Sequence, residues 1–275
     1  MIHRRIDLPT QGAYLETYFL DYSDRLKNSA SRPVILICPG GGYSYTTDRE
    51  AEPLALAFAA RGYHAAVLRY PCAPTRYPAA LMSLGQAVLW LREHAEEFHM
   101  DGGRLCVSGY SAGGHLAASL GVFWHRDFLT GMLGCTAQDI RPQALLLGYP
   151  VITDGDGAEK GDFYSLRNLL GRDASAEEVA FQCLENHVTS QTPPTFLWST
   201  DTDELVPIRN SILFSAALCR AGVSQEVHIY SVGEHGLGLA NAVTEDTLPG
   251  KARVNADCEG WIDLAERWLR RQFGV

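Results

Sequence analysis

A serine stands at the centre of a short glycine-bounded motif in the middle of the chain. Residues 109–113 read Gly-Tyr-Ser-Ala-Gly and fit the pattern G-x-S-x-G, with Ser111 at its centre. An apolar run that predicts a strand precedes the motif, and an Ala- and Leu-rich segment that predicts a helix follows it. A tight strand-to-helix turn strains the serine backbone and lifts its hydroxyl above the sheet edge. We therefore predict that Ser111 is a nucleophile; the alternative is a chance match among 26 glycines.

A run of three glycines lies after an earlier apolar segment, in residues 39–43 (PGGGY). Attack of a serine on a carbonyl carbon creates an oxyanion, which preorganised backbone N–H groups must stabilise. Glycines let the backbone turn its N–H groups toward a substrate without an obstructing Cβ. We expect Gly41 and Gly42 to form this oxyanion hole with Ala112, the residue after the nucleophile. The alternative, a phosphate loop, lacks both the G-x-G-x-x-G spacing and the G-K-[ST] ending.

The serine also needs a histidine to take its proton, and nine histidines compete for that role. His235 lies in residues 233–236 (GEHG), directly after the last predicted strand, where a loop can reach the nucleophile. We therefore predict that His235 is the general base. His115, four residues after Ser111 and inside the predicted helix, is expected to pack or to form local hydrogen bonds.

An acid must orient the histidine, and residues 199–207 (STDTDELVP) offer three carboxylates after a predicted strand. The order serine, acid, histidine is the one that α/β hydrolases use. The loop before Val-Pro is where the acid belongs in this order, which favours Asp203, with Asp201 as the alternative. Glu204 is expected to be a solvated neighbour.

Strands and helices that would position these residues alternate along the chain. Short, continuous apolar runs are typical of strands buried on both faces of a parallel sheet. Such strands are expected at residues 34–38, 64–69, 105–108, 144–147, 195–198 and 227–230, with an edge strand at 14–20. Helices are expected at residues 50–61, 79–98, 113–123, 208–221 and 256–271. This alternation predicts a doubly wound α/β fold, a mostly parallel central sheet with helices on both faces. The G-x-S-x-G turn and the order of the candidate triad residues then point to the α/β-hydrolase type of this fold.

One stretch, residues 153–194, breaks this alternation with several turns and a closing Pro-Pro pair. Forty residues are too many for a plain connection in a compact domain, so we expect a small cap or lid there. No linker or repeat divides the chain, which predicts one domain over residues 1–275. Residues 154–157 (DGDG) resemble the start of a calcium loop but lack its remaining ligands, so we expect a solvated turn and no metal.

Composition narrows the classes of protein that fit. The formal net charge is −9 and no cluster of Lys or Arg is present, which disfavours nucleic-acid binding. No run approaches 18 apolar residues and no apolar stretch follows the first residues, so we expect neither a membrane span nor a signal peptide, and a cytoplasmic location. Seven scattered cysteines without a C-x-x-C pair are expected to be reduced core residues. The sequence leaves both a monomer and a homo-oligomer possible.

Further motifs resemble one family of α/β-hydrolase esterases, which groups the acetylxylan esterases with bacterial feruloyl-esterase-like (BD-FAE-like) enzymes. The resemblance covers roughly residues 30–270. The runs that carry it are residues 68–71 (LRYP), 77–81 (YPAAL), 87–92 (AVLWLR), 109–117 (GYSAGGHLA), 148–152 (GYPVI), 193–197 (PPTFL), 203–207 (DELVP) and 235–239 (HGLGL).

This resemblance implies the triad and the oxyanion hole named above, and hydrolysis of small acyl esters, often acetyl groups on sugars. The chain departs from the family pattern at two places. Pro39 stands where the glycine loop of relatives begins with His, and residues 198–200 (WST) stand where relatives often have His before Thr. Neither departure touches a predicted catalytic position.

Together these features predict a serine carboxylic-ester hydrolase that needs no cofactor and acts through an acyl-enzyme. Its substrates would be small-molecule esters, above all acetyl esters, with those of sugars or xylo-oligosaccharides among them. One alternative is a small peptidase or amidase with the same triad. Another is a non-catalytic small-molecule receptor on this scaffold, although a receptor has no use for all three triad residues.

Overall fold

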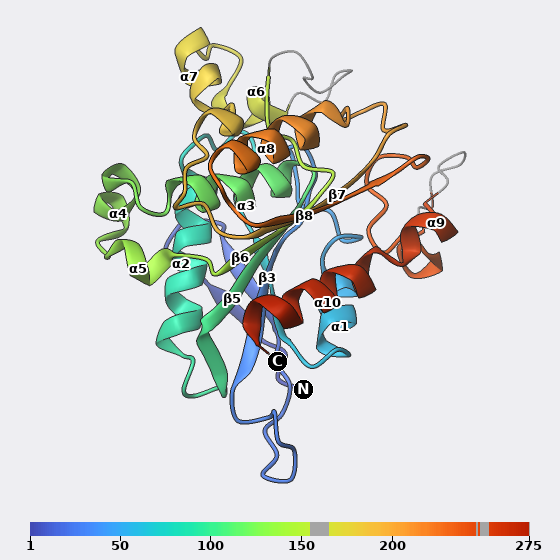
Figure 1. Cartoon of the computed structure of the whole chain (residues 1–275). Helices are drawn as coiled ribbons and strands as arrows, with labels where there is room; N and C mark the ends of the chain where they lie inside the picture. Colours follow the sequence, from blue (N-terminus) through green and yellow to red (C-terminus); the bar gives the residue numbers. More distant parts are fainter. Residues whose placement is uncertain (155–164, 246, 248–252, 275) are drawn as a thin grey trace.

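An eight-stranded sheet organises the computed structural model, which describes residues 1–154, 165–245, 247 and 253–274 (Figure 1). The strand order across the sheet is β1-β2-β4-β3-β5-β6-β7-β8. The strands are β1 (Arg5–Asp7), β2 (Tyr14–Tyr18), β3 (Arg32–Cys38), β4 (His64–Arg69), β5 (Met100–Tyr110), β6 (Ala144–Gly148), β7 (Thr195–Thr200) and β8 (Gln225–Tyr230).

Six neighbouring strands pair in parallel, in the order β4, β3, β5, β6, β7 and β8, while β1 and β2 run antiparallel to their neighbours. Their continuous apolar sequences follow from burial on both faces, as in β6, where every residue is buried. The strand predicted over residues 14–20 is present as β2, but its predicted position at the edge of the sheet is wrong. The edge is β1, which is too short and too polar to be recognised by hydrophobic periodicity.

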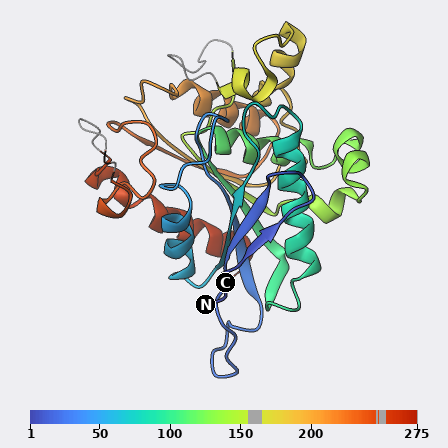
Figure 2. The same cartoon turned by 180° about the vertical axis from the view of Figure 1, so that it is seen from behind.

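Helices cover both faces of the sheet (Figures 1 and 2). One apolar cluster joins the sheet to α1 (Glu52–Ala59), α9 (Ala256–Glu259) and α10 (Trp261–Phe273). The other joins it to α2 (Ala79–Glu93), α3 (Ala112–Phe123), α4 (Asp127–Leu133), α5 (Ala137–Ile140) and α8 (Arg209–Arg220). The short helices α4 and α5 lie where no helix was predicted. The segment expected as a single helix over residues 256–271 is divided between α9 and α10 at Gly260.

The chain between β6 and β7 contains α6 (Ser165–Leu170), α7 (Ala176–Phe181) and a 3-10 turn, η1 (Leu184–Asn186). In Figure 1, α6 and α7 lie at the upper end of the molecule. Residues 155–164 lie outside the described residues, and with them most of the acidic turn considered for calcium. The cap over residues 153–194 therefore stays a prediction.

Several sequence expectations concern the chain as a whole. Cys38, Cys106, Cys183 and Cys258 are buried, whereas Cys219 is exposed, so the prediction that all seven cysteines are core residues is wrong for Cys219. None of the described helices has the length and hydrophobicity needed to cross a membrane. Within the described ranges, no group of three or more His, Cys, Asp or Glu side chains is arranged to hold a metal ion.

Candidate active site

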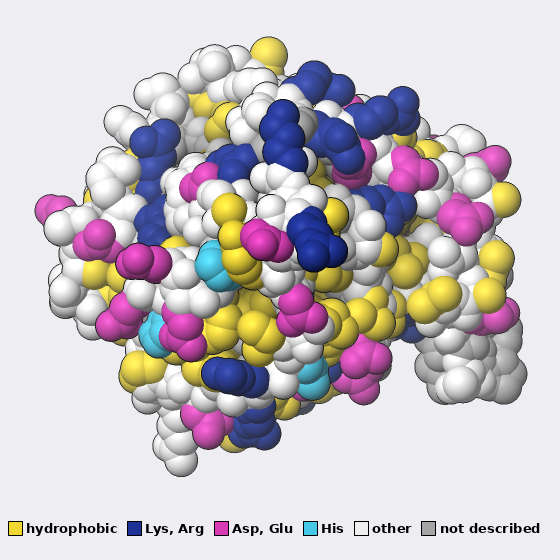
Figure 3. Space-filling model, turned by 90° about the horizontal axis from the view of Figure 1, so that it is seen from below, with side chains coloured by type: hydrophobic (Ala, Val, Ile, Leu, Met, Phe, Trp, Pro, Cys, Tyr) yellow, Lys and Arg dark blue, Asp and Glu magenta, His cyan; other side chains and the backbone are white. Residues whose placement is uncertain are grey.

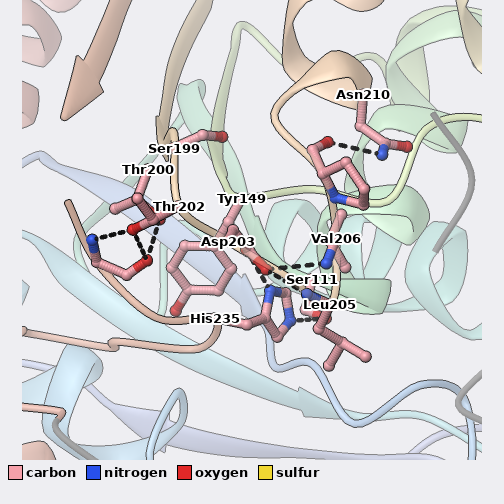
Figure 4. A network of polar contacts seen from close by, with 12 residues as sticks. Ser111, Tyr149, Ser199, Thr200, Thr202, Asp203, Leu205, Val206, Asn210 and His235 are labelled. Carbon is pink, nitrogen blue, oxygen red and sulfur yellow. Dashed lines mark hydrogen bonds and ion pairs between the residues drawn. The ribbon is translucent and has the colours of Figure 1, made fainter. Parts of the chain in front are cut away.

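Four loops meet at the carboxyl edge of the parallel strands. They follow β3, β5, β7 and β8, and they carry the glycine loop, Ser111, Asp203 and His235. Parallel strands end at the same edge of a sheet, so residues far apart in the sequence come together there. Figure 4 shows Ser111, His235 and Asp203 in one line of hydrogen bonds.

Ser111 occupies a strained turn between β5 and α3. Its backbone φ of 56° and ψ of −124° lie where L-residues are rarely found. The flanking glycines are required by close packing of the helix on the sheet. A Cβ on Gly109 would lie 2.1 Å from the carbonyl oxygen of Gly113, and a Cβ on Gly113 would lie 2.1 Å from the carbonyl oxygen of Cys38. The G-x-S-x-G pattern therefore reports both the turn and the close approach of α3.

The imidazole of His235 joins the serine to the acid. Its Nε2 lies 2.7 Å from Ser111 Oγ, and its Nδ1 lies 2.7 Å from Asp203 Oδ2. Because a carboxylate only accepts hydrogen bonds, Nδ1–H donates to Asp203, which leaves Nε2 free to accept the serine proton. This is the tautomer that a general base needs.

Asp203 is held by its own loop as well as by the histidine. Its Oδ1 accepts hydrogen bonds from the backbone N–H groups of Leu205 and Val206, each at 2.9 Å. The residue is 5% exposed, so little solvent competes for these bonds. The alternative acid, Asp201, is exposed, as is Glu204. The structure therefore brings Asp203, and not Asp201, to the histidine.

Two threonines fix the loop that carries His235, and the sequence offered no motif for them. The hydroxyls of Thr200 and Thr202 donate to the carbonyl oxygen of Gly233 at 2.9 and 3.0 Å (Figure 4). The N–H of Gly233 donates in turn to Thr202 Oγ1 at 2.9 Å. The end of β7 thus holds both the acid and the start of the histidine loop.

Backbone N–H groups beside the serine are available to an oxyanion. Gly41 and Gly42 have φ values of 126° and 62°, which glycine adopts without the cost that a Cβ adds. A Cβ on Gly40 would lie 2.8 Å from Ser111 Cβ, so the glycine loop lies directly against the nucleophile. In the part of the chain that the structure describes, no protein atom accepts a hydrogen bond from the N–H groups of Gly41, Gly42 or Ala112.

His115 connects the glycine loop to the segment after α7. Its Nε2–H donates to the carbonyl oxygen of Gln182 at 3.0 Å, so its Nδ1 accepts from the hydroxyl of Tyr43 at 2.9 Å. Burial lowers the pKa of His115 to about 4, which keeps the ring neutral at neutral pH. Of the two alternatives predicted for His115, packing is confirmed, because the side chain is fully buried, and local hydrogen bonding is wrong, because both side-chain partners are distant in sequence.

Helix α6 contacts the same loop from the other side. The side-chain amide of Asn168 donates to the carbonyl oxygen of Gly42 and to Ser44 Oγ, both at 2.8 Å. An amide that bonds both groups fixes the direction of the Gly42 carbonyl, and with it the orientation of the adjoining peptide groups. Nothing in the sequence around Asn168 marked it as part of the site.

A separate hollow of about 370 Å³ lies at the amino-terminal edge of the sheet. Its lining includes Lys27, Arg32, Arg61, Tyr63, Arg104 and Arg270. Arg61 and Arg104 form salt bridges with Asp263 and Asp101. Viewed from below, the molecule likewise has Lys and Arg interspersed with Asp and Glu (Figure 3). No histidine lines this hollow among the described residues.

Comparison with known proteins places this site in context. A sequence profile described as BD-FAE matches residues 20–218. The chain is 34% identical to endo-1,4-beta-xylanase B of Butyrivibrio fibrisolvens over 85% of its own length and 35% of the relative's. It is 26% identical to an acetylxylan esterase of Xylanibacter ruminicola over 78% of its own length and 42% of the relative's. The chain thus spans less than half the length of these two relatives.

Solved structures match over nearly the whole chain. The carboxylesterase Cest-2923 of Lactobacillus plantarum superposes with a TM-score of 0.87 and 32% identity, covering 99% of this chain and 98% of that one. An acetyl ester-xyloside bifunctional hydrolase of Caldicellulosiruptor lactoaceticus superposes with a TM-score of 0.81 and 32% identity. This match covers 98% of this chain and 96% of that one. These neighbours confirm the predicted α/β-hydrolase fold class.

Proposed function

The chain belongs to the BD-FAE family of carboxylic ester hydrolases, and from this premise we propose that it cleaves small acyl esters through a covalent acyl-enzyme on Ser111. One observation carries the proposal. Ser111 Oγ, His235 and Asp203 form a continuous line of hydrogen bonds, both 2.7 Å long. Beside them lie backbone N–H groups that have no acceptor among the described residues.

In the first half of the proposed reaction, His235 Nε2 takes the serine proton while Oγ attacks the ester carbonyl carbon. The carbonyl oxygen becomes an oxyanion and accepts hydrogen bonds from N–H groups of Gly41, Gly42 and Ala112. Each such donor contributes about a hundred- to a thousandfold in rate. The intermediate then expels the alcohol, which takes the proton from the imidazolium, and the acyl group stays on Ser111.

The second half reverses these roles with water as the nucleophile. His235 takes a proton from the water, whose oxygen attacks the acyl carbon, and the same N–H groups stabilise the second oxyanion. Collapse returns the proton to Ser111 Oγ and releases the carboxylic acid. Every group required belongs to this chain or to solvent.

For substrates we propose acetyl esters, including those carried by sugars or xylo-oligosaccharides. The support is the names of two similar proteins, an acetylxylan esterase and an acetyl ester-xyloside hydrolase.

One experiment tests the reaction and the acyl preference together. Wild type and Ser111→Ala are compared for labelling by a fluorophosphonate probe and for hydrolysis of p-nitrophenyl acetate and octanoate. We expect labelling and acetate hydrolysis in wild type only, with acetate preferred over octanoate. Full activity of Ser111→Ala would contradict the mechanism, and a long-chain optimum would contradict the acyl preference. Acetylated xylo-oligosaccharides then test the sugar substrates directly.

A further inference from the structure

A buried carboxylate outside the triad lies behind the catalytic loops. Glu50, in the turn before α1, is 1% exposed. Its Oε2 accepts a hydrogen bond from the N–H of Gly40 at 2.8 Å, and its Oε1 accepts one from the hydroxyl of Tyr149 at 2.7 Å. Burying a charge is costly unless it is paired and hydrogen-bonded, so a carboxylate kept here requires an explanation.

Tyr149 extends this contact to the histidine loop. Its hydroxyl accepts a hydrogen bond from the N–H of Gly238 at 3.0 Å, and its ring meets the His235 ring edge-on with centroids 5.2 Å apart. Burial and the neighbouring Glu50 hold the pKa of Tyr149 well above its ordinary value, so the phenol stays protonated and donates to Glu50. Tyr149 lies beside the triad in Figure 4.

Two guanidinium groups lie near Glu50 beside the histidine loop. The position that a Cβ would take on Gly236 lies 3.3 Å from guanidinium nitrogens of both Arg49 and Arg253, and 3.8 Å from Glu50 Oε1. Gly236 directly follows His235 in the chain. One oxygen of Glu50 and one nitrogen of each arginine therefore lie close to the same point of the histidine loop.

The backbone of Tyr149 is constrained as well. Its φ of 37° is unusual for a non-glycine residue, and strain of this kind persists only where the surroundings enforce it. Its N–H donates to the carbonyl oxygen of Trp198 at 2.7 Å, while the preceding carbonyl, that of Gly148, accepts from the N–H of Ser111 at 3.1 Å. Tyr149 thus contacts the elements that carry all three triad residues.

We propose that Glu50 and Tyr149 are positioning residues that fix the oxyanion loop and the histidine loop relative to each other. Glu50 holds the glycine loop through Gly40, and Tyr149 holds the histidine loop through Gly238. The inference rests on the proposed function, because its effect is read through that reaction. A misplacement of about 1 Å can cost about a hundredfold in rate, so loss of either group slows the chemistry without removing a reacting atom.

The test uses Glu50→Gln and Tyr149→Phe, both close to the native shapes. The amide of Gln has one oxygen acceptor and cannot accept from both donors as the carboxylate does, and Phe keeps the ring but loses the hydroxyl. We expect Glu50→Gln to lower kcat for p-nitrophenyl acetate by about 10- to 100-fold with KM changed less than about threefold. We expect Tyr149→Phe to lower kcat as well. In the double variant, the fold-decrease in kcat is expected to be smaller than the product of the two single decreases.

Matched controls separate positioning from general destabilisation. Glu52→Gln alters an exposed carboxylate two residues away from Glu50. This carboxylate accepts a hydrogen bond of 3.4 Å from the hydroxyl of Tyr18. Tyr63→Phe removes a buried hydroxyl that has no partner among the described residues and lies away from the site. Both controls are expected to keep kcat within twofold, and thermal melting of every variant reports its stability.

The kcat values of the two variants decide between a positioning role and a purely structural one. Full kcat in Glu50→Gln, with only a lower melting temperature, would show a purely structural role and overturn the inference. If Glu50→Gln does not fold, unchanged kcat in Tyr149→Phe overturns it and reduced kcat supports it. Failure of the proposed function is distinguishable, because wild type itself would then not be labelled by the fluorophosphonate probe.

Discussion

Asp203 meets the imidazole with one carboxylate oxygen and the backbone with the other. An asparagine can keep only part of this arrangement, because its NH2 group cannot accept hydrogen bonds from Nδ1–H or from the N–H groups of Leu205 and Val206. The histidine then adopts the wrong tautomer. We expect Asp203→Asn to lower kcat for p-nitrophenyl acetate by about 10⁴-fold, the scale known for this change in a serine triad.

Asp201→Asn is the matched control, since it makes the same change two residues away on an exposed side chain. We expect its steady-state kinetics to stay within twofold of wild type. If Asp201→Asn proved the more damaging of the two, the assignment of the acid would be wrong.

At the residue scale, the sequence pointed to residues that the structure brings together wherever the chemistry leaves a local pattern. Ser111 has its glycines, and His235 has a glycine-flanked loop after a strand. The choice between Asp203 and Asp201 depends on how one turn folds, which spacing alone leaves open. Glu50 and Asn168 lie in no motif, and Tyr149 lies in residues 148–152, a run that supported the family resemblance but gave the tyrosine no role. Each of the three acts on a loop that is distant in sequence or belongs to another element.

Among the elements between β6 and β7, α6 contacts the glycine loop directly. Asn168 donates to the carbonyl oxygen of Gly42, so the helix helps to aim the N–H groups of the oxyanion loop. We expect Asn168→Ala to lower kcat for p-nitrophenyl acetate by about 3- to 30-fold, less than the loss of an oxyanion donor itself.

Arg172→Ala serves as the control for Asn168→Ala, because Arg172 is exposed and follows the same helix. It is expected to leave kcat unchanged. Equal kcat in both variants would mean that α6 plays no part in ordering the oxyanion loop.

Element boundaries differ from prediction for definable reasons. The helix expected over residues 79–98 ends at Glu93, yet no glycine marks this stop. His99 instead takes a left-handed backbone, with φ of 54°, and the N–H of Met100 returns to the carbonyl oxygen of Ala95 at 2.8 Å. The predicted end at residue 98 therefore coincides with this turn, and the difference is confined to residues 94–98, which form turns and not α-helix.

At the scale of the whole molecule, the fold could be predicted because its signals are repeated. Each buried strand has its own apolar run, and each major helix has its own stripe, so single errors at β1 or α9 leave the architecture intact. The way in which four loops converge is set by sheet order. Strand order depends on contacts between distant segments, and no single run in the sequence encodes those contacts.

Two buried histidines make the stability of the fold depend on pH. Burial lowers the pKa of both His64 and His115 to about 4, from about 6.5 in the unfolded chain. Between these values the unfolded state binds more protons than the folded state. The contribution of these two histidines to the free energy of unfolding is therefore fully present above about pH 6.5. It falls as the pH drops toward 4 and changes little below that pH. Each histidine contributes up to about 3 kcal/mol to this loss.

His64 allows that expectation to be tested away from the catalytic loops. Its Nδ1 accepts from the N–H of Leu20 at 3.0 Å, and a glutamine oxygen can replace this acceptor without titrating. We expect urea unfolding at pH 7, 5.5 and 4.5 to show a smaller loss of unfolding free energy in His64→Gln than in wild type. Carboxylates titrate alike in both proteins, so the difference isolates the imidazole. Identical pH dependence in the two would mean that His64 is protonated in the fold without penalty.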